Sequence, residues 1–166
     1  CISSAASDVY KRQQHAGVVV GLGGVAAHVL CKLPRDAEGY MGRLRCVQEI
    51  SAVTAACMMV KTSVFKAVGG FDEELKVAFN DIDLCMKVRK YGVKIVFTPY
   101  AELYHYESKS RGMEDTPEKQ LRFSREVNCF RRKWERELLK GDPYYNPNLT
   151  LNNTDCSLRK QEKNGD

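Results

Sequence analysis

Hydrophobic positions along the chain form short clusters separated by glycine-rich or acidic stretches. The β-branched run at residues 17–20 ends at a glycine cluster, which predicts a buried strand, a tight loop and a short helix before residue 33. Residues 50–60 are almost wholly apolar and predict either one buried strand or two short elements, because periodicity does not distinguish these. A helix over residues 82–91 is predicted by apolar side chains at helical spacing, namely Leu84, Cys85, Val88 and Tyr91.

The residues at the expected helix ends are those that commonly start or stop a helix. Asn80 is predicted to cap the helix at 82–91, and Gly92 can supply the left-handed residue that ends it. A shorter helix at residues 61–67 is expected to stop at Gly69 and Gly70.

Two extended segments and one long helix follow. A strand at 93–97 is expected to end at Thr98 and Pro99, with a second extended piece at 101–106. Thr116 with Pro117 predicts the start of a helix that runs to Gly141. Its apolar stripe consists of Phe123, Val127, Phe130, Trp134 and Leu138.

The two ends of the chain differ in character from its middle. Residues 4–13, SAASDVYKRQ, resemble a translated cloning or sequencing adapter, so residues 1–13 are interpreted as a non-native extension and set aside. Residues 14–143 then form the domain, and residues 144–166 form a polar C-terminal tail, with residues 144–151 expected to wrap back on the domain. On this interpretation the chain is a fragment of a protein that continues upstream.

Composition narrows the class of protein. With 43% hydrophobic and 28% charged residues, the chain has the balance of a globular domain rather than a disordered one, and no apolar run reaches the length of a membrane helix. The net charge of +5 suits an anionic substrate or surface without requiring nucleic acid. Seven cysteines without a CxxC pair indicate neither a disulfide framework nor a zinc knuckle, which favours a reducing cytoplasm.

Acidic residues gather around GGFDEE and NDID, and two interpretations stay open. A glycine-hinged acidic loop holding Asp72 and Glu73 can place a carboxylate as a general base in a cleft. Alternatively, Asn80, Asp81 and Asp83 only cap a helix and complement its dipole. Asp81 and Asp83 also spell D-x-D, but residues two apart on a helix do not share a face, so joint chelation of a metal is not expected.

Two further patterns predict binding to other partners. Residues 21–26 satisfy G-x-G-x-x-A behind a strand, with Glu49 as a ribose-binding acid, which is the dinucleotide fingerprint of an oxidoreductase. The helix at 118–140 mixes Arg, Lys and aromatic residues as nucleic-acid binders do. Because its aromatics fall on the apolar stripe and its acids dilute the charge, packing on the domain is preferred, and contact with anionic lipid headgroups is a further alternative.

The combination of VGGFDE, the helix start NDIDLC and the sequence YHYES-x-SRG resembles bacterial family 2 glycosyltransferases of the GT-A fold. The resemblance runs from about residue 14 to residue 151 and corresponds to the C-terminal half of such a domain. It implies an α/β fold with a mixed sheet and flanking helices. The nucleotide-binding half with its own D-x-D is expected upstream, so the fragment alone is expected to be inactive.

The resemblance also implies roles for individual residues. Asp81 matches the general base that removes the proton of the acceptor hydroxyl, with Asn80 where the family often has a second acid. His105 matches a histidine near the metal and the diphosphate. Ser110 and Arg111 fall on the loop expected to close over the donor phosphates. With Asp72, Glu73 and Asn80, these two residues complete the expected substrate-binding set.

The function implied is inverting transfer of a sugar from a nucleotide-sugar donor to a polysaccharide or other cell-surface glycan, or to a lipid-linked acceptor. A divalent cation, Mn²⁺ or Mg²⁺, is expected to offset charge on the leaving diphosphate. The expected location is the cytoplasm, at the inner face of the membrane if peripheral contact occurs, and no nucleic acid is expected as a partner. The alternative is a non-catalytic module that binds an acceptor or another protein.

Overall fold

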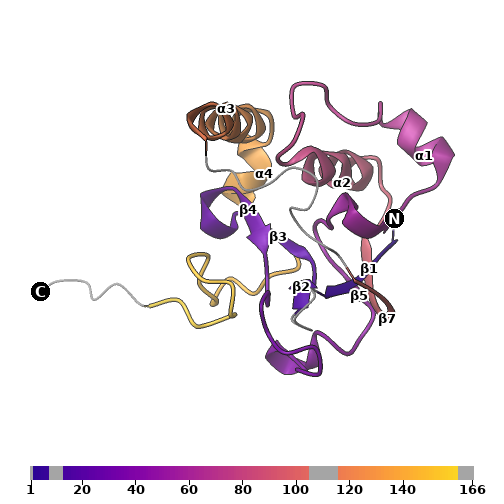
Figure 1. Cartoon of the computed structure of the whole chain (residues 1–166), viewed down its shortest axis with the longest axis vertical. Helices are drawn as coiled ribbons and strands as arrows, with labels where there is room; N and C mark the ends of the chain where they lie inside the picture. Colours follow the sequence, from indigo (N-terminus) through magenta and orange to yellow (C-terminus); the bar gives the residue numbers. More distant parts are fainter. Residues whose placement is uncertain (1, 8–12, 105–115, 161–166) are drawn as a thin grey trace, which may run out of the picture.

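The structure is a computed structural model that describes residues 2–7, 13–104 and 116–160. Within these residues, one five-stranded sheet and a separate two-stranded hairpin are combined with four α-helices (Figure 1). The chain is thus a mixed α/β protein with small sheets, which agrees with the α/β part of the prediction, whereas the GT-A half-domain stays a prediction. Among the described helices, none is both long and apolar enough to cross a membrane.

The larger sheet is organised around two parallel strands, β1 (Ile2–Ser7) and β7 (Val96–Tyr104). On its other side β1 pairs antiparallel with β2 (Gln13–His15) and β6 (Met58–Met59), while β5 (Gln48–Glu49) pairs antiparallel with β7. Residues 2–7, which the sequence analysis set aside, therefore form an interior strand of this sheet. Whether residues 1–13 are native to the protein stays a prediction.

Strand β7 corrects the prediction of two extended segments divided at Pro99. The strand starts at Val96 rather than residue 93 and continues through Pro99 to Tyr104. Its register with β1 jumps from Thr98 opposite Ser4 to Glu102 opposite Ala5, so three residues of β7 are left out of the ladder. Proline has no N–H to donate, and a bulge at this point lets the strand continue past it.

The glycine cluster forms a hairpin, which overturns the dinucleotide fingerprint. β3 (Val18–Val20) and β4 (Ala26–His28) pair antiparallel across a short 3₁₀ turn, η1 (Leu22–Gly24). The N–H of Gly21 donates to Val25 O at 2.8 Å, closing the hairpin. A dinucleotide site needs a helix N-terminus after the strand, and here a second strand follows, so the helix expected before residue 33 and the fingerprint are both wrong.

The helices agree closely with the predicted ranges. α1 (Thr62–Ala67) and α2 (Asn80–Lys90) are followed by α3 (Pro117–Lys133) and α4 (Glu135–Lys140), the long predicted helix being divided at Trp134. Figure 1 shows α2 between α1 and the α3–α4 pair. Thr116 accepts from Lys119 N at 3.4 Å, as expected for an N-cap. At the end of α2, Gly92 N and Val93 N donate to Arg89 O and Val88 O, a Schellman motif at the predicted glycine.

The core lies between α2, the hairpin and the ends of β5 and β7. The residues 50–60 segment divides into short elements: a buried stretch at 50–53, the 3₁₀ turn η3 (Ala55–Cys57) and β6. The buried residues at 50–53 belong to the same hydrophobic core as Leu84 and Val88 from α2 and Phe130 from α3.

Residues 144–160 also pack on the domain, with Tyr145, Leu149 and Cys156 buried. The segment 144–151 therefore wraps back as expected.

Candidate functional site

Asp81 stands in the first turn of α2 with its carboxylate held by two backbone N–H groups. Oδ1 accepts from its neighbour Ile82 N at 2.8 Å, and Oδ2 accepts from Ala55 N of η3 at 3.0 Å. The side chain is half-buried, and Ala55 itself is exposed. A carboxylate oxygen has more than one lone pair, so Asp81 keeps acceptor capacity toward solvent.

Cys85 explains why the start of α2 lies beside η3. It is one helical turn after Asp81 and therefore on the same face. Its buried sulfur donates to Val53 O at 3.7 Å and accepts from Val53 N at 3.5 Å, which fixes α2 against the chain just before η3. Burial raises the pKa of the Cys85 thiol to about 12, so it stays protonated and acts as a structural side chain.

The approach to α2 differs from the prediction. Phe79, not Asn80, is the N-cap residue; it has φ 63° and provides no side-chain cap, while Asn80 is the first helical residue. Asn80 Oδ1 accepts from Asp81 N at 2.7 Å, so its side chain still contacts the base candidate. A non-glycine residue in the left-handed region costs about 1 kcal/mol or more and persists only where neighbours hold it.

Aromatic packing and a buried carboxylate provide that support. The Phe79 ring lies 5.3 Å from the ring of Phe130 and 5.8 Å from that of Phe123, both on α3. Glu126 of α3, 3% exposed, accepts from Ala78 N at 2.8 Å and from Val77 N at 3.2 Å. Helix α3 thereby fixes the loop that delivers Asp81.

Asp83 occupies a different environment from Asp81. It is fully buried, and its Oδ1 accepts from Trp134 Nε1 at 2.9 Å. The ammonium groups of Lys133 and Lys87 lie 2.8 Å and 3.0 Å from its two oxygens. The two carboxylates of D-x-D therefore engage separate partners, and Asp83 serves to fix α2 against the junction of α3 and α4.

The acidic loop before α2 is joined to Asp83 through Lys133, which forms ion pairs with both Asp72 and Asp83. Gly69 N and Gly70 N close the end of α1 on Lys66 O and Phe65 O, so these glycines stop a helix as predicted. Asp72 forms an ion pair with Lys133 and accepts from Glu74 N, and these two interactions lower the pKa of its carboxyl. Glu73 is exposed. The structure thus gives Asp72 a structural partner that the sequence analysis did not foresee.

Three of the expected site residues, His105, Ser110 and Arg111, lie outside the described residues. Within the described ranges no group of three or more His, Cys, Asp or Glu side chains is arranged to hold a metal ion. Asp83 is already engaged by two lysines and an indole, so it does not offer a ligand beside Asp81. The described residues therefore do not fit a metal site, and the expected cation stays a prediction attached to His105.

Glu126 was missed as a functional support, because the sequence analysis treated it as an acid that dilutes surface charge. Its spacing contained a signal: it lies three residues after Phe123 and four before Phe130, hence on the apolar face of α3. A charged residue on that face needs a buried partner. For Lys133, which forms ion pairs with both Asp72 and Asp83, no pattern in the sequence indicated this role.

Comparisons with known proteins find several that are similar to this chain. It is 57% identical over 148 residues to the uncharacterized protein y4gI of Sinorhizobium fredii, covering 89% of this chain and 16% of that protein. It is 38% identical over 154 residues to the O-antigen biosynthesis protein RfbC of Myxococcus xanthus, covering 92% and 12%. Over 62 residues it is 36% identical to the N-acetylglucosaminyl-diphospho-decaprenol L-rhamnosyltransferase of Mycobacterium tuberculosis, covering 37% and 20%.

The chain is thus similar to proteins named for glycan biosynthesis and for glycosyl transfer. It spans only 16% and 12% of the length of the first two relatives. No protein-family model and no solved structure matches the chain.

Proposed function

We propose that the intact protein is a glycosyltransferase of family 2 and the GT-A fold, and that Asp81 is its general base. The observation that carries the proposal is the half-buried Asp81 carboxylate, oriented by Ala55 N and Ile82 N at the start of α2. The names of the two similar proteins involved in glycan synthesis support the class. The proposed substrates are a nucleotide-sugar donor and a polysaccharide, other cell-surface glycan or lipid-linked acceptor.

The proposed step is a single displacement at the anomeric carbon. Asp81 takes the proton of the acceptor hydroxyl while the acceptor oxygen bonds to that carbon and the bond to the nucleoside diphosphate breaks. The product has inverted configuration, and the departing diphosphate retains the bonding electrons. General-base catalysis of this kind contributes about 100-fold to 10,000-fold to a rate.

The described residues contribute to this step through positioning. The N–H groups of Ala55 and Ile82 hold the carboxylate in a fixed orientation. Asn80 lies next to Asp81, and its side-chain NH₂ group is proposed to reach substrate. Asp72 and Glu73 are proposed at the edge of the site, with Asp72 acting through its ion pair to Lys133.

The remaining parts of the proposal rest on the resemblance. Ser110 and Arg111 are proposed to bind the donor phosphates, and His105 a divalent cation. No step is assigned to the cation. A cytoplasmic location, at the inner membrane face, belongs to the proposal in the same way.

The experiment is sugar transfer by the intact parent protein with a panel of nucleotide sugars, in the presence of Mn²⁺ or Mg²⁺ or of a chelator. Released nucleoside diphosphate measures turnover, and NMR of the product gives the anomeric configuration. Transfer with inversion supports the class, and loss of turnover with chelator supports the cation. Retention of configuration contradicts the proposed displacement, and absence of donor binding favours the non-catalytic module.

A further inference from the structure

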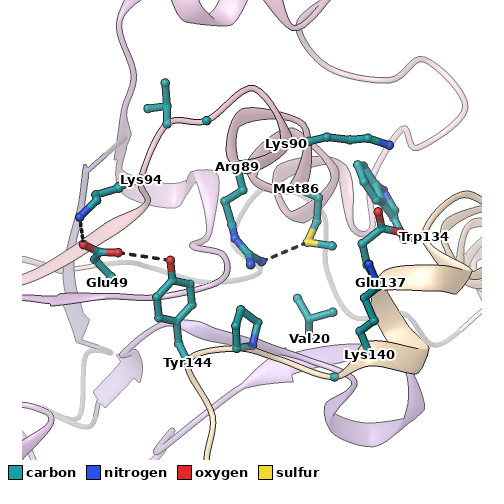
Figure 2. A pocket seen from close by; sticks show the side chains of 14 residues that line it. Val20, Glu49, Met86, Arg89, Lys90, Lys94, Trp134, Glu137, Lys140 and Tyr144 are labelled. Atoms are coloured by element: carbon teal, nitrogen blue, oxygen red, sulfur yellow. Dashed lines mark hydrogen bonds and ion pairs between the residues drawn. The ribbon is translucent and has the colours of Figure 1, made fainter.

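A cavity of about 540 Å³ lies beside the last turn of α2 (Figure 2). Asp81 is in the first turn of the same helix. The walls of the cavity come from β3, β5, the last turn of α2, α4 and the segment 141–144. Arg89 and Lys90 lie eight and nine residues beyond Asp81, about 12 to 14 Å along the helix. The volume is within the range of small-molecule sites, and the position is separate from the candidate active site.

Arg89 points into this cavity and is held by neutral groups. Its guanidinium carbon lies 5.4 Å from the centre of the Tyr144 ring, and Nη1 donates to Met86 Sδ at 3.7 Å. Among the described residues, no carboxylate forms an ion pair with it. Several guanidinium N–H groups therefore keep their capacity to bind an anion in a preset orientation.

The rest of the charged lining leaves a positive surplus. Lys94 is paired with Glu49, which also accepts from the Tyr144 hydroxyl at 3.2 Å. Lys90 lies 5.8 Å from the Trp134 ring centre, and Lys140 stands beside Glu137 on α4. Four cationic side chains thus face two carboxylates. The C-termini of α2 and α4 add roughly half a negative charge each, which does not cancel the surplus.

The walls of the cavity are fixed before any ligand arrives. Asp142 accepts from Val20 N and from Tyr144 N, both at 2.8 Å, which joins the 141–144 segment to β3. Trp134 is anchored by its bond to Asp83. The two aromatic rings beside Arg89 and Lys90 are therefore held by contacts of their own, so the walls need little ordering when a ligand binds.

We propose that this cavity binds a phosphate ester that also carries hydroxyl groups. The phosphate is placed on the Arg89 guanidinium beside Tyr144, with the ammonium of Lys90, on the adjoining face of α2 beside Trp134, as a second cation. The Glu137 carboxylate accepts from the hydroxyls. A free sugar or glycerol phosphate and the headgroup of phosphatidylglycerol share this chemistry. The proposal does not depend on the function assigned to Asp81.

The first arm of the test uses sn-glycerol 3-phosphate with the 166-residue chain. Trp134 is the single tryptophan and lines the cavity, so its fluorescence reports occupancy, and calorimetry gives the affinity and stoichiometry. We expect saturable binding at one site and none with glycerol. Arg89→Gln and Lys90→Gln should each weaken it at least about tenfold, since bonds to charged groups are lost. Lys66→Gln on α1 removes the same charge elsewhere and should change nothing.

The second arm distinguishes the two sources of the ligand. Vesicles of phosphatidylglycerol in phosphatidylcholine should retain the chain, relative to pure phosphatidylcholine, if the headgroup is the source. That retention should be lost in Lys90→Gln and competed by glycerol phosphate. Lys90 is exposed, so its substitution is expected to leave the melting temperature unchanged, which unfolding scans check.

Three results would overturn the proposal. The first is no saturable binding of glycerol phosphate and no selective retention on vesicles. The second is equal weakening by Lys66→Gln and Lys90→Gln, which would mean attraction to net charge only. The third is vesicle retention that persists when Arg89 and Lys90 are both replaced by glutamine.

Discussion

Asp81 and Asp83 are the same residue type, two positions apart on one helix, yet their surroundings assign them different roles. Asp83 is fully buried and meets two lysines and an indole N–H. Asp81 is half-buried, and within the part of the chain that the structure describes its carboxylate accepts from the backbone N–H groups of Ala55 and Ile82. An acid that must take a proton from a substrate needs access, and an acid that fixes a helix needs partners.

The two regions also differ in how their backbone is supported. Around Asp83, side-chain ion pairs connect α2 with the loop at Asp72 and with Lys133. Before Asp81, the chain turns through a left-handed Phe79 and is held by Glu126 from α3. Strained backbone next to an accessible carboxylate is typical of functional sites, whereas the Asp83 side has the contacts of a structural core.

Replacing Asp83 by alanine gives the largest expected loss of stability. Removal of one partner from a buried ion cluster typically costs about 3 to 5 kcal/mol, and here Trp134 Nε1 also loses its acceptor. Asp81→Ala, the matched control, should cost about 1 kcal/mol or less because its carboxylate is accessible to water. Urea unfolding of both variants measures the difference. Equal losses would contradict the division of roles.

Replacing Glu126 by alanine tests the support of the Asp81 loop. The N–H groups of Val77 and Ala78 would lose their acceptor, and an unsatisfied buried donor costs about 1 to 3 kcal/mol. In the intact protein, transfer activity should also fall, since the loop positions Asp81. Glu135→Ala on α4 is the control, because Glu135 is exposed. A Glu126 variant with unchanged stability and activity would show that the loop holds itself.

His15 on β2 is a second buried side chain that can titrate. Burial, with repulsion from His28 whose Nδ1 lies 3.2 Å from its own, lowers the pKa of His15 to about 3 from an ordinary 6.5. Below pH 6.5 the unfolded chain therefore takes up a proton that the folded chain does not, and stability falls as the pH falls toward 3. The maximum slope is about 1.4 kcal/mol per pH unit.

The measurement is urea unfolding of the chain and of His15→Gln between about pH 6.5 and pH 5. The wild-type chain should lose about 1 to 2 kcal/mol more than the variant across this interval. Parallel stability curves would contradict a neutral, buried His15.

The sequence predicted those parts of the fold that depend on local chemistry. Thr116 starts α3, Gly92 ends α2, and Gly69 ends α1, because each forms hydrogen bonds within a few residues of its position. The prediction for the glycine cluster at 21–24 was wrong because glycine is common both in tight turns that lead to a strand and in those that lead to a helix. Pro99 was misread because its place in a bulge depends on the partner strand β1.

For the site, the resemblance in the sequence led to Asp81 as the base, which stays a prediction, but no feature of the sequence indicated the contacts around it. Long-range contacts decide that Glu126 binds the backbone at 77–78 and that Lys133 joins Asp72 to Asp83. Such pairs are separated by about 50 residues or more along the chain, and no local pattern encodes them. The burial of Asp83 likewise follows from the packing of Trp134, which the helical stripe predicted only as apolar.

The most direct test of the central claim is the transfer rate of the intact protein with Asp81→Asn. Asparagine preserves the shape, and its single amide oxygen can accept from Ala55 N or from Ile82 N, but it does not take a proton. The account predicts a fall in kcat of about 100-fold to 10,000-fold, with donor affinity and melting temperature unchanged. A variant that retains wild-type turnover would contradict the assignment of Asp81 as the base.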